Sequence, residues 1–155
     1  HIPAHTEAVL LLDQTQLTTG YLTLLFSKGK GAEIRITYAE AMYEDKVDKT
    51  TKSYSLPVKG HRDSIECKKM IGYEDRLLPD GGDGRSFTSL WWRTWRYVQL
   101  TITTAGEPLV VDDLYGTFTG YPFKQDITFA SLALPESNDI LSSGWRTARM
   151  CANET

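Results

Sequence analysis

Apolar residues that recur at every second position, in short segments ended by Gly, Pro or Asp, constrain this chain more than any other feature. The alternation places Leu22, Leu24 and Phe26 on one side of a first segment and Ile34 and Ile36 on one side of a second. A period of two is the repeat of a β-strand with one buried face. The first two thirds of the chain are therefore predicted to form short, mainly antiparallel strands.

Two turn sequences join neighbouring predicted strands. Residues 27–31, with Gly29 and Gly31, separate the segments 21–26 and 32–38. These glycines can adopt the positive φ that a tight hairpin needs. Residues 105–108 follow the strand predicted at 93–103, and a partner strand is predicted at 109–121. We therefore predict a hairpin at each of these two turns.

The remaining segments complete a β-rich pattern. A continuous apolar run at residues 9–12 predicts a further strand, and another strand is predicted near residues 68–78. Within residues 93–103, Val98 and Leu100 are expected on one face and Trp95 and Tyr97 on the other. Residues 44–64 are polar and lack periodicity, which predicts an exposed, mobile excursion.

The last twenty residues change to a helical pattern. Residues 135–138 supply helix-initiating side chains, and apolar residues follow at helical spacing. They are Ile140, Leu141, Trp145, Ala148 and Ala152. A single amphipathic helix must bury this stripe against another surface. We expect the helix to belong to a following domain.

Charge and cysteine content exclude some classes of protein and leave others open. With 17 Lys and Arg against 20 Asp and Glu, the net charge is -3, which does not favour a nucleic acid or a membrane surface as partner. No apolar run approaches the roughly 20 residues of a membrane helix. Cys67 and Cys151 either form one bridge or stay as thiols. The chain begins with His rather than Met and has no signal-like segment, as expected of an excised or processed piece.

A longer stretch of sequence, residues 85–100, carries a family resemblance. Its Phe87 and the run Arg96-Tyr97-Val98 resemble the strand signature of the β-sandwich that precedes the catalytic domain in bacterial α-L-rhamnosidases. The segments 12–21, 31–41 and 113–116 resemble further parts of this domain, in the family's order. Residues 144–155 are similar to the first helix of the family's helical catalytic barrel.

The resemblance implies an all-β fold: a jelly-roll or concanavalin-like antiparallel β-sandwich with one C-terminal helix. It divides the chain into a sandwich at 1–134 and a helix at 135–155 that starts the helical catalytic domain. The parent enzyme would hydrolyse terminal α-L-rhamnosides by an inverting mechanism that uses two carboxyl groups. In the family those groups lie in the helical barrel, so no residue here inherits a catalytic role. The parent's location, periplasmic, secreted or cytoplasmic, stays open, as does the oligomeric state.

Several polar groups resemble chemical sites, but their patterns favour structural roles. The neighbouring carboxylates at 44–45, 74–75 and 112–113 would point to opposite faces of a strand, so none forms a ready acid and base. The loop at 80–84 lacks the spaced ligands of a helical calcium loop, and a plain turn is expected. The polar set at 61–67, with His61, Asp63, Ser64 and Cys67, lacks the further ligands of a zinc site. No metal or cofactor is predicted.

A cluster of aromatic residues is the one candidate for ligand binding. Trp91, Trp92 and Trp95 lie close together with Arg93 between them. Indole rings stack on sugar faces and donate hydrogen bonds, but they also pack in cores and at domain interfaces.

The sequence therefore leaves three functions to be distinguished. In the first the sandwich supports the catalytic domain or the substrate cleft of a rhamnosidase-like parent. In the second it is an autonomous carbohydrate-binding module whose surface tryptophans line a complete groove. In the third it is a structural spacer with an exposed apolar patch on the terminal helix and no affinity for sugars.

Overall fold

The protein is described by a computed structural model that covers residues 1–44, 58–126, 128–129 and 131–153. The chain forms two compact units, His1–Thr117 and Phe118–Thr155. Within the described ranges the elements are β1 (Glu7–Lys28), β2 (Glu33–Ala39), β3 (Tyr43–Glu44), β4 (Lys68–Lys69), β5 (Tyr73–Leu77), β6 (Arg85–Thr88), β7 (Arg93–Thr103), β8 (Leu109–Phe118) and α1 (Ser137–Cys151).

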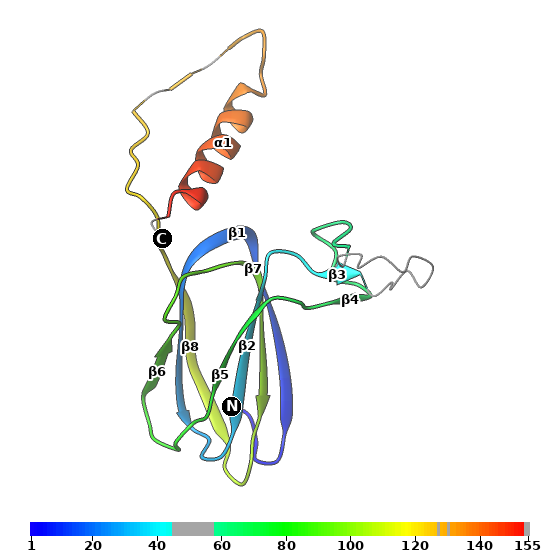
Figure 1. The fold of residues 1–155 in the computed structure, drawn as a ribbon, viewed down its shortest axis with the longest axis vertical. Helices are drawn as coiled ribbons and strands as arrows, with labels where there is room; N and C mark the ends of the chain where they lie inside the picture. Colours follow the sequence, from blue (N-terminus) through cyan, green and yellow to red (C-terminus); the bar gives the residue numbers. More distant parts are fainter. Residues whose placement is uncertain (45–57, 127, 130, 154–155) are drawn as a thin grey trace. The chain divides into compact units, whose positions relative to one another are not determined.

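The 22-residue strand β1 joins the two layers of the sandwich. Its first half pairs antiparallel with β7, its second half pairs with β6, and β8 also pairs with β1. The register with β7 shifts between Asp13 and Thr18, where Thr15 has a φ of 64°. Figure 1 shows β1 arching over at this irregularity. A β-bulge increases bending in this way, and it lets one strand serve both layers.

The sheet order β5-β2-β7-β1-β6 folds an apolar face inward from each layer. The buried side chains are Leu22, Leu24 and Phe26 from β1, Ile34, Ile36 and Tyr38 from β2, and Val98, Leu100 and Ile102 from β7. Burying each such side chain contributes roughly 1.5–3 kcal/mol. The predicted antiparallel β-sandwich with one C-terminal helix is confirmed.

Both predicted hairpins are wrong, although the strands themselves form. β2 pairs with β5 and β7 rather than with β1, and β8 pairs with β1 rather than with β7. The apolar faces of consecutive strands are buried in one core between the layers, so each connection crosses from one layer to the other. Gly29 and Gly31 have the expected positive φ, and a Cβ on Gly29 would lie 2.6 Å from Leu109 Cδ1.

The predicted position of Trp95 is also wrong. Trp95 was expected on the face of β7 opposite to Val98, but it is 3% exposed and packs in the same core cluster as Val98, with its ring centroid 6.1 Å from that of Tyr38. Four β1 residues lie between the partners of Tyr97 and Trp95, where only Arg96 separates the two on β7. The pairing of the two strands is therefore irregular beside Trp95, so simple alternation does not assign its face.

Several loop and strand predictions are confirmed in part. Residues 9–12 lie in β1, where all four apolar side chains are exposed. The loop at 80–84 is a turn, in which Gly82 N–H donates to Asp80 Oδ1 at 2.9 Å and Arg85 pairs with Asp80 at 2.7 Å. Of the predicted polar excursion, residues 45–57 lie outside the described residues, and residues 58–64 form an irregular loop.

The second unit contains the predicted helix. In α1, Trp145 contacts Phe123, with ring centroids 6.4 Å apart, and Tyr121 N–H donates to Ala152 O at 2.7 Å. Among the described residues no helix has the length and hydropathy to cross a membrane. Cys67 and Cys151 are both free and exposed.

Candidate functional site

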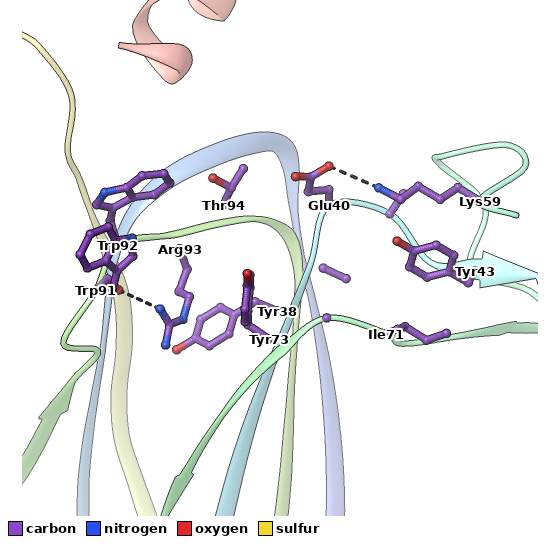
Figure 2. Close-up of a pocket in the computed structure, with 13 residues that line it drawn as sticks. Tyr38, Glu40, Tyr43, Lys59, Ile71, Tyr73, Trp91, Trp92, Arg93 and Thr94 are labelled. Carbon is purple, nitrogen blue, oxygen red and sulfur yellow. Dashed lines mark hydrogen bonds and ion pairs between the residues drawn. The ribbon is translucent and has the colours of Figure 1, made fainter. Parts of the chain in front are cut away.

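A cleft of about 580 Å³ lies in the first unit, and we call it the tryptophan cleft. Its walls come from residues 38–41 and Tyr43 at and after the end of β2, residues 71–73 at the start of β5, residues 91–94 at the start of β7, and Lys59. All of these residues belong to the His1–Thr117 unit. Figure 2 shows the side chains that line it.

Close approach of two backbones shapes one wall. β2 and β5 pair in register with Tyr38 opposite Tyr73. Gly72 precedes this pair, and a Cβ built on it would lie 1.7 Å from the carbonyl oxygen of Tyr38. Only glycine permits this approach, because any side chain would collide with backbone that cannot move aside.

The structure separates the predicted tryptophan cluster into two parts. Trp91 and Trp92 line the cleft, with ring centroids 6.1 Å apart, and Trp91 is 53% exposed. Trp95 is buried in the core and does not line the cleft. The packing interpretation therefore holds for Trp95, and the two other indoles face the cleft (Figure 2).

Arg93, the fourth residue predicted to bind a ligand, contacts both β5 and the tryptophan segment. Its Nη2 donates to Asp75 Oδ1 at 2.8 Å, and its Nη1 donates to the carbonyl oxygen of Trp91 at 3.4 Å. Its guanidinium carbon lies 5.7 Å from the Tyr38 ring centroid and 5.6 Å from that of Tyr73, within cation–π range. Arg93 therefore links β5, β7 and the backbone of the tryptophan pair.

Polar atoms without partners are concentrated at this place. Six buried side-chain atoms in the described part of the chain lack a hydrogen-bond partner, and four of them are Tyr38 Oη, Asp75 Oδ2, Trp92 Nε1 and Arg93 Nε. Buried donors and acceptors are almost always satisfied, and each one left alone costs about 1–3 kcal/mol. Each of these atoms is buried, so they belong to the packed wall around the cleft rather than to its open surface.

Burial is the main cause of an unusual titration at Tyr38. The phenol is 2% exposed, and burial raises its pKa well above the usual range, with the nearby Asp75 carboxylate acting in the same direction. Asp75 acts on Tyr38 electrostatically, yet the hydroxyl makes no hydrogen bond of good geometry. Tyr38 therefore stays a neutral hydroxyl next to a carboxylate.

The opposite wall carries a second ion pair. Lys59 Nζ lies 3.4 Å from Glu40 Oε2 and 5.4 Å from the Tyr43 ring centroid. Ile71 adds an exposed apolar surface beside them. Sequence reasoning missed these residues and Tyr38 and Tyr73, because they are distant in sequence and only the β2–β5 pairing brings them together. Tyrosines at strand ends were the only available signal.

The other polar sets considered from the sequence do not line the tryptophan cleft. Asp63 pairs with Arg96, the backbone of His61 accepts a hydrogen bond from Lys68 Nζ, and the Ser64 N–H donates to His61 O at 3.2 Å. Asp112 accepts a hydrogen bond from Ser27 at 2.7 Å. Across the described residues, no group of three or more His, Cys, Asp and Glu side chains is arranged to hold a metal ion.

An apolar groove lies within the second unit. It has a volume of about 540 Å³ and is lined mainly by Phe129, Ile140, Leu141, Trp145 and Ala148. Ile140 is 59% exposed and Leu141 is 43% exposed. This is the exposed apolar patch that the spacer interpretation predicted on the terminal helix.

Comparison of the chain with known protein families, with curated proteins and with solved structures found no match.

Proposed function

We propose that the tryptophan cleft binds carbohydrate, and that the chain is a non-catalytic β-sandwich of a rhamnosidase-like glycoside hydrolase. The observation that carries the proposal is the pairing of an exposed indole with tyrosine and charged side chains in one cleft. Trp91 is 53% exposed, and Trp92, Arg93, Tyr38 and Tyr73 line the same cleft.

The chemistry of a sugar matches this combination. A pyranose has apolar C–H faces, which stack on aromatic rings, and a rim of hydroxyl groups, which hydrogen-bond to polar atoms. The cleft volume of about 580 Å³ falls within the range of small-molecule sites, roughly 300–1,000 Å³. The arrangement resembles such sites, with aromatic walls and a few convergent polar groups.

The link to a hydrolase rests on the sequence resemblance alone. We assign no acid or base to this chain, because Glu40, which lines the cleft, and Asp75, which pairs with Arg93, are each held in an ion pair. Inverting hydrolysis needs one carboxyl group that gives a proton and one that activates water. We propose that these lie in a helical catalytic domain of the parent, with α1 as its first helix.

Two roles for the cleft follow from this proposal. It extends the substrate cleft of the parent, or it acts as an autonomous carbohydrate-binding module. The second role is favoured by one observation: every residue that lines the cleft belongs to the His1–Thr117 unit. A site complete within one unit can bind sugar without a second domain.

Isothermal titration calorimetry with L-rhamnose and a panel of methyl glycosides tests the proposal. At least one sugar is expected to bind with a Kd at or below about 10 mM, as is common for single-sugar sites of modest affinity. Trp91→Ala should abolish this heat, because it removes the stacking surface. Trp145→Ala, a change of the same kind in the second unit, should leave it unchanged. No heat with any sugar would refute carbohydrate binding by this chain.

A further inference from the structure

The charged side chains of the tryptophan cleft occur in matched pairs. Two cations, Arg93 and Lys59, line the described part of the cleft, and each has a carboxylate partner, Asp75 at 2.8 Å and Glu40 at 3.4 Å. We propose, resting on the carbohydrate-binding function above, that this cleft selects uncharged sugars and rejects uronic acids and sugar phosphates.

Arg93 lacks the free edge that an anion needs. Arginine binds a carboxylate or phosphate best through two parallel N–H donors. Here Nη2 is used by Asp75, Nη1 is used by the Trp91 carbonyl, and Nε is buried. The rings of Tyr38 and Tyr73 also lie within cation–π distance of the guanidinium carbon. An anionic ligand beside this cation would meet the Asp75 carboxylate.

The Glu40–Lys59 pair also disfavours an anionic ligand, because its cation already has a carboxylate partner. Glu40 and Lys59, which both line the cleft, form an ion pair, and Lys59 also lies over the ring of Tyr43 (Figure 2). A ligand carboxylate placed near either cation would lie close to Glu40 or Asp75. Like charges at such separations disfavour each other, and the loss of hydration of the ligand anion adds to this cost.

The atoms that remain suit a hydroxyl group. Among the residues that line the cleft, the Tyr43 and Tyr73 hydroxyls can donate and accept, and the Glu40 carboxylate can only accept. A sugar hydroxyl both donates and accepts, so neighbouring hydroxyls satisfy donors and acceptors together. A carboxylate only accepts, so it has no proton to donate to Glu40.

Matched pairs of methyl glycosides test this inference by calorimetry. Each neutral gluco, galacto or manno glycoside is compared with its C6-carboxylate counterpart, at about 50 mM and about 500 mM NaCl. The neutral member of the pair that binds best should bind at least about tenfold tighter than its uronate. Its Kd should change less than about twofold with salt.

A single substitution tests whether the preference for neutral sugars shifts toward the uronate when a cleft carboxylate is removed. Glu40→Gln leaves Lys59 without its partner, so the uronate should gain at least about threefold in affinity relative to the neutral sugar. Glu107→Gln makes the same change of charge in the exposed turn after β7, away from the cleft, and should not shift this ratio.

The outcomes separate the two proposals. Uronate binding that equals or exceeds neutral binding and weakens with salt would overturn charge selection, and carbohydrate binding would stand. Failure of every sugar, neutral or acidic, would instead refute the proposed function, and the inference would fall with it.

Discussion

The Arg93 guanidinium donates to Asp75 Oδ1 at 2.8 Å, and the two side chains are 17% and 16% exposed. This contact connects the start of β7 with β5 beside the tryptophan cleft. Because Arg93 also holds the Trp91 carbonyl, the pair has two functions: it stabilises the fold and it positions the indole.

Removing one partner of this pair should destabilise the protein. Asp75→Ala leaves a mostly buried guanidinium without its carboxylate, and we expect the free energy of unfolding to fall by about 2 kcal/mol. Urea unfolding measures the change. Asp83→Ala is the matched control, because its ion pair with Lys28 is exposed and should contribute less than about 1 kcal/mol. Equal losses for the two variants would contradict a structural role for the Arg93–Asp75 pair.

A second prediction concerns the packing of β8 against the core. A Cβ on Gly116 would lie 3.0 Å from Trp95 Cζ2, which is tighter than ordinary contact. Gly116→Val should therefore lower the free energy of unfolding by about 1–3 kcal/mol through overpacking. Gly106→Ala should be neutral within about 0.5 kcal/mol, because no atom lies within 4 Å of its Cβ position. A neutral Gly116→Val variant would show that Trp95 is not held against β8.

Because the Tyr38 phenol is buried, we predict that the free energy of unfolding falls in alkali. Its pKa is raised in the folded protein, above the value of 10.0 for an ordinary tyrosine, so the folded state holds this proton more tightly than the unfolded state. The contribution is fully present below about pH 10 and is lost as the pH rises further, by up to about 1.4 kcal/mol per pH unit.

Urea unfolding at pH 8, 10 and 11 checks this dependence. The decline above pH 10 should be shallower in Tyr38→Phe than in the wild type. Part of the slope should remain, because burial also raises the pKa of Tyr97. Identical slopes for wild type and Tyr38→Phe would contradict the burial of a neutral phenol.

The exposed face of α1 gives a prediction for the second unit. Replacing Ile140 and Leu141 together by Ser removes two exposed apolar side chains from the groove. We expect lower fluorescence of a hydrophobic dye such as ANS, because exposed apolar patches bind it. Ser142→Ala and Ser143→Ala together, at exposed positions of the same helix, are the control. Unchanged dye fluorescence would contradict an accessible apolar groove.

The strands and the helix could be predicted from the sequence, because their apolar periodicity is local. Residues 93–103 form β7 as expected, and the helix occupies 137–151 of the predicted 135–155. Strand pairing was not predictable in this way. The turn at Gly29 and Gly31 has the backbone conformation expected of a hairpin, but burial of both strands in one core sends the chain to the opposite layer.

The candidate site was predicted only in part, for the same reason. Trp91, Trp92 and Arg93 line the cleft, and all three come from one segment of sequence. Trp95 lies in the core instead, next to a register irregularity between β1 and β7 that alternation cannot reveal. The opposite wall with Lys59 depends on contacts between segments far apart in the sequence.

Sugar binding in the tryptophan cleft is tested most directly by the intrinsic tryptophan fluorescence of the chain during titration with the sugar that binds best in calorimetry. We predict a saturable change in emission that is retained in Trp145→Phe, which alters the indole of the second unit, and lost in Trp91→Phe combined with Trp92→Phe. A saturable change that persists without these two indoles would place the sugar elsewhere and contradict binding in the tryptophan cleft.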